Sequence, residues 1–138
     1  MESQVTPAIP RGGCLTTTRT FNQRLRGHDL FPDSLRNKMP DLYSTDAAED
    51  PTVVCKFFLP GTVLTWYAIE AGSFSGNADA PVTFYGYVVG SEDEELGYFD
   101  LDALEFITVK SSGVRCVVER DLHWIPVPLS KVKSGEVR

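Results

Sequence analysis

Residues 119–124, with the sequence ERDLHW, gather the side chains of this chain that are best suited to chemistry. If residues 114–124 form one strand, alternate side chains share a face, so Glu119, Asp121 and His123 lie together. Same-face neighbours lie roughly 7 Å apart along a strand, close enough for a carboxylate to orient an imidazole. The pattern is therefore compatible with a general acid–base pair, in which Glu119 or Asp121 orients His123. Such a pair would suit a hydrolase-like enzyme.

The chemistry around these three residues is incomplete. The sequence offers no nucleophile elbow, no phosphate-binding glycine loop and no second nearby histidine for a metal site. His28, the other histidine, falls in the N-terminal region. A strand face bearing arginine, glutamate, aspartate and histidine is usually exposed to solvent or to a partner, and this interpretation is preferred to the catalytic one.

Arg120 falls on the apolar side of the same predicted strand. A buried guanidinium needs a partner because an unpaired charge is costly to bury. The acids of the ELGYFDLD segment are the natural candidates, namely Glu95, Asp100 or Asp102. The alternative is a bulge or turn near Glu119 that sends Arg120 to solvent.

Neither a metal nor a cofactor is expected. The three cysteines, Cys14, Cys55 and Cys116, are too far apart in sequence for a zinc site, and their odd number argues against a disulfide framework. Cys55 and Cys116 fall in apolar runs and are expected to behave as core residues. The acidic residues Glu92–Glu95 lack the ligand spacing of a calcium loop, so we expect an exposed hairpin tip.

The formal net charge of −6 hides an asymmetry. Between residues 3 and 28 there are four arginines and no acid: Arg11, Arg19, Arg24 and Arg26. Such a region can contact nucleic-acid phosphates or fold back on its own acidic domain. Because Phe21 is its one aromatic residue, and because proline, glycine and threonine interrupt any period, we expect a flexible, extended basic arm over residues 1–30. Nucleic-acid binding through this arm remains an alternative hypothesis.

The remaining residues, 31–138, are predicted to form a single domain. Runs rich in β-branched and aromatic residues predict strands, and Pro60-Gly61 predicts a hairpin turn between the first two. The predicted strands are residues 53–59, 63–70, 82–90, 96–99 and 114–124, with short helices at 35–39, 101–107 and 129–132. The order predicts an α+β fold in which short helices cover one side of a mostly antiparallel sheet of about five strands.

No apolar run approaches the roughly 18 residues that cross a bilayer, so a membrane role is not expected. The N-terminus lacks the basic start and apolar stretch of a secretory signal. Cytoplasmic residence is the resulting expectation.

Several motifs taken together resemble one family, the domain of unknown function 2958. They span about residues 35–132 and read PDLYST, VVCKFFLP, TWYAIE, FYGYVVG, ELGYFDLDALE and ERDLHW, followed by PLSKV. The resemblance implies a compact domain found in accessory regions of bacterial plasmids, phages and integrative elements. It implies no catalytic residues.

These observations together predict a small acidic accessory protein that acts by binding another protein. The most specific version of this hypothesis is an inhibitor of a host defence complex, either a restriction or a CRISPR complex. The candidate contact residues are Glu92, Asp93, Glu94, Glu95, Glu119, Arg120, Asp121, His123 and Trp124, and the loop of residues 71–80 is a further candidate.

Overall fold

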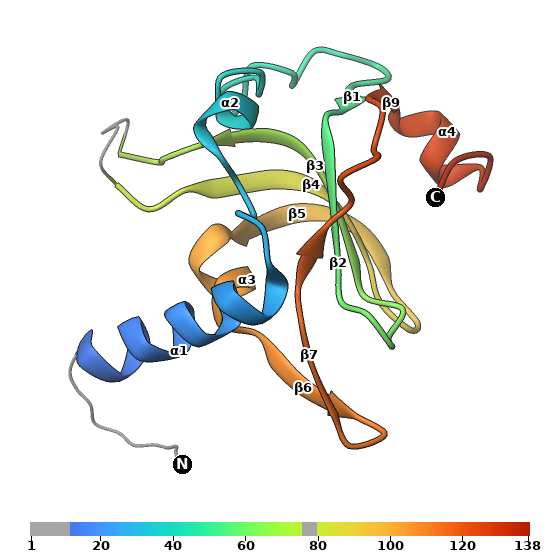
Figure 1. Ribbon diagram of the computed structural model, residues 1–138. Coiled ribbons are helices and arrows are strands. Elements are labelled where there is room, and N and C mark those ends of the chain that lie inside the picture. The colour runs from blue at the N-terminus through green and yellow to red at the C-terminus, as the bar shows by residue number, and fades with distance from the viewer. Residues whose placement is uncertain (1–11, 76–79) are drawn as a thin grey trace.

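A computed structural model of the 138-residue chain describes residues 12–75 and 80–138. Its centre is a five-stranded antiparallel sheet with the order β5-β4-β3-β2-β8 (Figure 1). The strands are β2 (Cys55–Phe58), β3 (Thr65–Gly72), β4 (Thr83–Val89), β5 (Glu94–Asp100) and β8 (Glu119–Arg120). The predicted α+β fold with an antiparallel sheet of about five strands is confirmed.

Two smaller sheets and four helices surround this centre (Figure 1). One small sheet pairs β1 (Thr52–Val53) with β9 (Val127–Pro128), and the other is a hairpin of β6 (Thr108–Ser111) and β7 (Val114–Val117). The helices are α1 (Gly12–Arg26), α2 (Asp33–Arg36), α3 (Leu101–Phe106) and α4 (Leu129–Lys133).

Apolar side chains cover both faces of the sheet. On one face, Phe84 contacts the rings of Phe31, Phe57 and Phe99, with centroids 4.8, 5.3 and 5.2 Å away. Leu35 of α2 and Leu104 of α3 pack in the same cluster. The other face carries a second cluster, in which Tyr67, Ile69 and Tyr87 meet Leu129 and Val132 of α4. Helices therefore pack on both faces, whereas the sequence predicted them on one.

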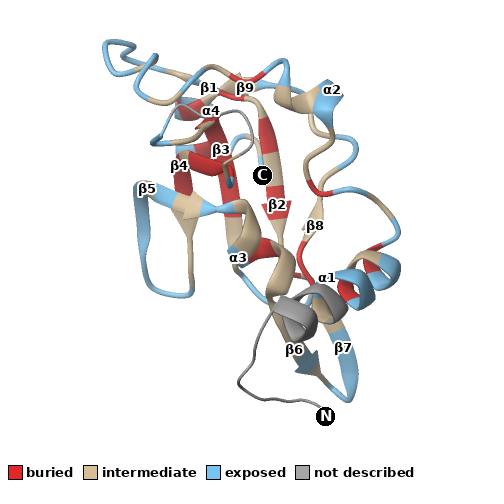
Figure 2. Ribbon diagram, turned by 90° about the vertical axis from the view of Figure 1, so that its left-hand side faces the viewer, coloured by how far each residue is buried: buried red, intermediate tan, exposed pale blue. Residues whose placement is uncertain are grey.

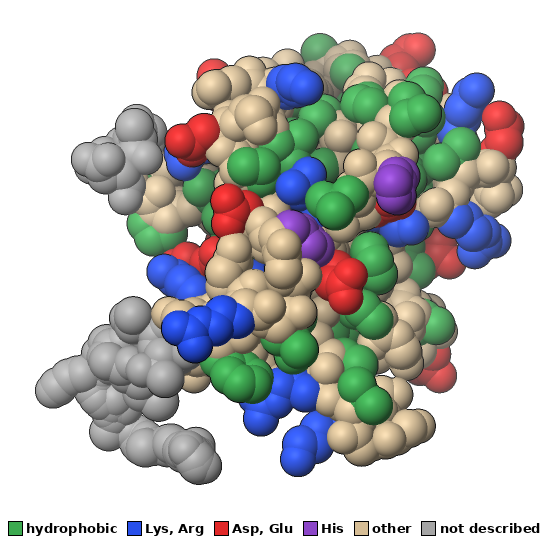
Figure 3. Space-filling view, in the orientation of Figure 1, with side chains coloured by type: hydrophobic (Ala, Val, Ile, Leu, Met, Phe, Trp, Pro, Cys, Tyr) green, Lys and Arg blue, Asp and Glu red, His purple; other side chains and the backbone are tan. Residues whose placement is uncertain are grey.

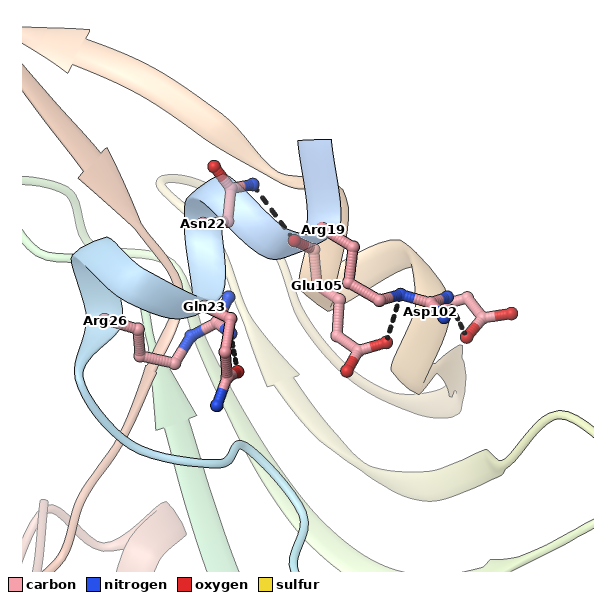
Figure 4. A network of polar contacts seen from close by, with 6 residues as sticks. All are labelled: Arg19, Asn22, Gln23, Arg26, Asp102 and Glu105. Carbon is pink, nitrogen blue, oxygen red and sulfur yellow. Dashed lines mark hydrogen bonds and ion pairs between the residues drawn. The ribbon is translucent and has the colours of Figure 1, made fainter. Parts of the chain in front are cut away.

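Residues 12–26 form helix α1, so the prediction of an extended arm over residues 1–30 is wrong for this stretch. The helix packs on α3 through polar contacts (Figure 4). The Arg19 guanidinium lies 3.0 Å from an Asp102 carboxylate oxygen and 3.2 Å from one of Glu105. The buried Asn22 side chain donates to the Glu105 carbonyl at 3.0 Å. Residues 1–11, including Arg11, lie outside the described residues.

The prediction of one strand over residues 114–124 is also wrong. The chain pairs with β6 as β7, crosses at Val118, and pairs with β2 as the two-residue β8. Val117 and Val118 are both buried, which breaks the period of two. Val114 and Leu122, expected on the buried side, are 62% and 57% exposed. Strand β8 ends at Arg120, and the Asp121 N–H makes one more backbone hydrogen bond to β2, to the Lys56 carbonyl at 2.9 Å.

Strands β3 and β4 approach closely at Gly86. A Cβ atom added to Gly86 would lie 2.0 Å from the Tyr67 carbonyl oxygen, a backbone atom that cannot turn away. Its partner across the β4–β5 ladder is Gly97, where an added Cβ would meet nothing within 4 Å. Position 86 therefore has no room for a side chain, whereas position 97 can accommodate one.

We expect Gly86→Ala to lower the free energy of unfolding by more than about 3 kcal/mol, since the β3–β4 ladder must shift to admit the methyl group. Gly97→Ala is the matched control, and its effect should stay within about 0.5 kcal/mol. Urea unfolding of both variants measures the difference. Equal stabilities for the two variants would contradict the close approach.

Candidate functional site

The residues predicted to do chemistry do line one open pocket of about 370 Å³. Both histidines of the chain, His28 and His123, line it, and both lie on the face shown in Figure 3. The lining residues are His28, Lys56, Phe58, Glu119, Arg120, Asp121, Leu122 and His123. The structure thus brings Glu119, Asp121 and His123 together, and it adds Lys56 and His28, which the sequence analysis did not place here.

The Asp121 carboxylate holds the backbone in place and does not orient an imidazole. Its Oδ1 accepts the His123 backbone N–H at 3.0 Å, and its Oδ2 lies 3.9 Å from the Lys56 Nζ. The His123 side chain is exposed, and within residues 12–75 and 80–138 no carboxylate pairs with it. The acid–base pair expected from strand spacing is not formed, because the strand ends before Asp121.

His28 connects the end of α1 to the sheet. Its Nε2 accepts the Arg120 backbone N–H at 3.0 Å. Desolvation lowers the pKa of His28 below 6.5, and the neighbouring Arg120 guanidinium lowers it further. A neutral imidazole suits this place, since one ring nitrogen must remain free to accept the N–H. No sequence pattern indicated this role, because none showed that residues 12–28 return to the sheet.

Arg120 lies opposite the buried Phe57 in the β2–β8 pair, so it does face the apolar side. Its guanidinium donates to the Asp29 carbonyl at 3.2 Å, and its Nε is buried without a partner among the described residues. The predicted acid partners are wrong. Glu95 and Asp100 belong to β5, at the opposite edge of the sheet from β8, and Asp102 at the start of α3 pairs instead with Arg19.

The predicted contact residues therefore fall at two separate places. The acidic group Glu92–Glu95 lies in the exposed β4–β5 turn and the start of β5. Trp124 is half-buried in the second core cluster, where its Nε1–H donates to the Val53 carbonyl at 3.1 Å. The indole is thus used by the fold, whereas the acids are exposed and Glu94 alone of the four accepts a side-chain hydrogen bond from a described residue, from the Tyr87 hydroxyl.

A cluster of exposed aromatic rings is the most distinctive surface feature. We call it the aromatic platform, and it consists of Tyr43, Phe74, Tyr85 and Tyr98. The Tyr98 ring centroid lies 6.3 Å from Tyr43, 5.4 Å from Phe74 and 5.1 Å from Tyr85. Tyr43, Phe74 and Tyr98 are 53%, 61% and 49% exposed, although they contact one another. The sequence pointed only to the loop of residues 71–80, which carries Phe74, because the four rings come from separate segments.

The buried carboxylate of Glu70 positions this platform. Glu70 is 1% exposed, and its oxygens accept the backbone N–H groups of Tyr43 at 2.7 Å and Thr45 at 2.9 Å. The Thr45 hydroxyl donates to the same carboxylate. Tyr43 has a φ of 70°, a left-handed conformation that a bulky residue adopts only when its surroundings impose it. The carboxylate thus fixes the backbone that presents the Tyr43 ring.

The charge around the platform is negative. The pKa of Tyr98 is raised by desolvation, by a hydrogen bond with Tyr43, and by the nearby acids Asp46 and Glu70. On the same face of β4, the Tyr87 hydroxyl donates to Glu94, which together with desolvation raises the pKa of Tyr87 to about 12. These phenols keep their protons at neutral pH, so the platform combines apolar rings with hydroxyl donors in an acidic setting.

A family model described as protein of unknown function (DUF2958) matches residues 30–132. The chain belongs to this family. The match begins after α1 and His28, so the matched region contains the sheet, the other residues that line the pocket and all four residues of the aromatic platform. No curated protein and no solved structure matches the chain.

The described residues form neither a metal-binding cluster nor a membrane-spanning helix. In the part of the chain that the structure describes, no three His, Cys, Asp or Glu side chains gather closely enough to hold a metal ion. Over the same residues, no helix has the length and apolar character needed to cross a membrane.

The depressed pKa of His28 predicts a pH dependence of stability. Because the folded chain binds this proton less readily than the unfolded chain, the stability that His28 contributes is fully present above pH 6.5. It is lost as the pH falls below 6.5 through the lower folded-state pKa. We expect the free energy of unfolding of His28→Gln to decline less than that of wild type between about pH 7.5 and about pH 5.5.

Urea unfolding at a series of pH values measures this difference. The matched control is His123→Gln, whose exposed imidazole should leave the slope at the wild-type value. If the free energy of unfolding changed with pH equally in wild type and in His28→Gln, His28 would not connect α1 to β8 as a neutral acceptor.

Proposed function

We propose that this chain is a non-catalytic protein-binding module, and that the aromatic platform is its main contact surface. The observation that carries the proposal is the mutual contact of four aromatic rings, three of which stay about half exposed or more. Scattered exposed apolar residues are ordinary on soluble proteins, whereas a contiguous patch usually marks an interaction site. Tyrosine is also among the residues that dominate binding energy at protein interfaces.

The platform has the properties that favour a specific contact. Its rings are held by Glu70 and by the β4–β5 ladder, so little conformational entropy is lost when a partner binds. The phenol hydroxyl groups offer hydrogen bonds at the edge of an apolar surface. The acids Asp46 and Glu70 make the setting negative, which supports a partner with a basic surface.

The catalytic alternative has weaker support. Glu119, Asp121 and His123 do share a pocket, but Asp121 is engaged by the His123 backbone and by Lys56. His28 is engaged by Arg120. Among the residues that line this pocket, no nucleophile lies within hydrogen-bonding distance of a base, and such a pair is the geometric requirement for acid–base or nucleophilic chemistry.

The nucleic-acid alternative has less support, because two of the three arginines that the structure describes in this region have partners within the fold. Of the arginines that the structure describes in residues 12–28, Arg19 pairs with two acids, and Arg26 is buried and donates to the Val118 carbonyl at 2.5 Å. Arg24 remains exposed. Within the described part of this region, that leaves little of the phosphate neutralisation on which such binding depends.

The most specific form of the proposal concerns the setting. The family resemblance supports a role in the cytoplasm of bacteria that carry mobile genetic elements, with a host defence complex, either restriction or CRISPR, as the partner. This part rests on association with the family and not on the chemistry of the site.

Site-specific photo-crosslinking in bacterial cells tests the proposal. A photoreactive phenylalanine analogue at position 74 should capture one protein in stoichiometric amounts. The same analogue at position 125, where the native side chain is 75% exposed but lies outside the platform, should not capture it. With the captured protein in hand, Tyr98→Ala should weaken binding by roughly 30-fold or more.

A further substitution completes the experiment. His123→Gln in the polar pocket should leave the affinity for the captured protein unchanged, since the pocket lies away from the platform. Capture of the same proteins from positions 74 and 125, or no capture from position 74, would contradict the proposal.

A further inference from the structure

Strand β5 forms an open edge of the central sheet. It pairs with β4 over seven positions, from Glu94 opposite Val89 to Asp100 opposite Thr83. Within residues 12–75 and 80–138, no strand pairs with its other side. Figure 2 shows β5 at the margin of the molecule with much of its length exposed. The outward backbone N–H and C=O groups of an edge strand remain available for pairing.

This edge lacks most of the features by which proteins protect an edge strand. It has no proline, lysine or arginine, and the middle residues Leu96–Phe99 carry no charge. Leu96 and Tyr98 are 42% and 49% exposed. The opposite edge, β8, is protected by its length of two residues and by Arg120. The contrast singles out β5 as the edge that can accept another strand.

The charge along β5 indicates what kind of strand fits. Glu94 and Glu95 lie at its start, directly after the exposed Glu92 and Asp93. Glu94 accepts the Tyr87 hydroxyl, and the other three make no ion pair with any described residue. If a second copy paired antiparallel with β5 over its full length, Glu94 of each copy would lie opposite Asp100 of the other, which disfavours self-pairing. A strand with lysine or arginine at alternate positions would instead pair with them.

The aromatic platform is continuous with this edge. Tyr98 belongs to both, because its ring contacts Phe74 and Tyr85 while its backbone lies in β5. A strand added beside β5 would place alternate side chains next to Leu96 and Tyr98, on the platform side of the sheet. Cationic side chains there could also lie over the tyrosine ring.

We infer that β5 receives an extended, lysine- or arginine-bearing segment of the partner protein, which adds a sixth strand to the sheet. The inference rests on the proposed function and specifies how the partner binds. Backbone hydrogen bonds would supply much of the affinity, and the acids and the platform would supply specificity.

A peptide probe tests this mode of binding without knowledge of the partner. The probe is a heptapeptide of alternating lysine and valine, added at up to millimolar concentration to the full-length chain labelled with nitrogen-15. We expect amide resonances of Glu94–Asp100 to shift. A heptapeptide of alternating glutamate and valine should leave them unchanged.

Two N-methylated forms of the lysine peptide make the test specific. One is methylated on the backbone nitrogens of the lysines and the other on those of the valines. In an added strand, one set of N–H groups faces β5 and the other faces solvent. One form should therefore bind like the parent peptide, and the other should lose binding.

Gly97 offers a matched pair of protein variants. A side chain at this position meets no heavy atom within 4 Å of its Cβ, so both Gly97→Lys and Gly97→Glu can be accommodated. We expect the lysine variant to bind the lysine peptide roughly threefold to tenfold more weakly than the glutamate variant.

Several outcomes would overturn the inference: no shift with the lysine peptide, equal binding of the two N-methylated forms, or a dimer formed through β5 in the free protein. None of these outcomes bears on the crosslink at position 74. If that crosslink captures a partner while the peptides fail, the protein-binding proposal stands and strand addition falls.

Discussion

The buried carboxylate of Glu70 is the interaction on which the surface of this protein depends. It lies on β3 directly after an irregularity in the β3–β4 register, where the ladder shifts between Ala68 and Glu70. A buried charge without partners would destabilise the fold by several kcal/mol. Glu70 avoids this cost by accepting three hydrogen bonds from Tyr43 and Thr45. The carboxylate and the loop that surrounds it therefore stabilise each other.

Contacts with β3 also fix the position of the loop before β1. The Ala71 N–H donates to the Pro40 carbonyl at 3.0 Å, and an added Cβ at Gly72 would lie 3.3 Å from the Leu42 side chain. These contacts hold residues 40–45 on the sheet and leave the Tyr43 ring beside Phe74 and Tyr98. The same face of the sheet is covered farther along by α4. The platform is thus the part of this face that no helix covers.

The opposite edge of the sheet joins the N-terminal helix to the core. His28 accepts from β8, and Arg26 reaches the Val118 carbonyl, so the basic stretch of sequence is part of the fold. Arg19 neutralises acids of α3. Two of the described arginines of this stretch are therefore engaged within the molecule, whereas the acids at the start of β5 stay exposed.

The sequence predicted the elements that are stabilised locally. Runs of β-branched and aromatic residues, with a turn at Pro60-Gly61, predicted β2, β3 and β4 to within two residues at each end. Helix α1 was missed because its glycine- and threonine-rich sequence has weak helix propensity, and its stability comes from contacts with α3 more than 80 residues away.

Two further features of the structure could not be predicted from the sequence. The chain between β7 and β8 changes sheets at Val118, and a pattern of alternation cannot reveal such a crossing. Glu119, Asp121 and His123 therefore line one pocket although they do not lie on one face of a single strand. The platform depends on the positive φ of Tyr43 and on a loop contact with Glu70, and neither leaves a periodic signal.

Amide hydrogen exchange at Tyr43 and Thr45 tests most directly whether Glu70 holds the platform. Although both residues lie in an irregular loop, their N–H groups should exchange at least about 100-fold more slowly than unstructured amides, which corresponds to an opening free energy of about 2.7 kcal/mol. In Glu70→Gln this protection should fall at both amides, while that of Phe57 in β2 is kept. Exchange at the unstructured rate in wild type, or protection that survives Glu70→Gln unchanged, would contradict the account.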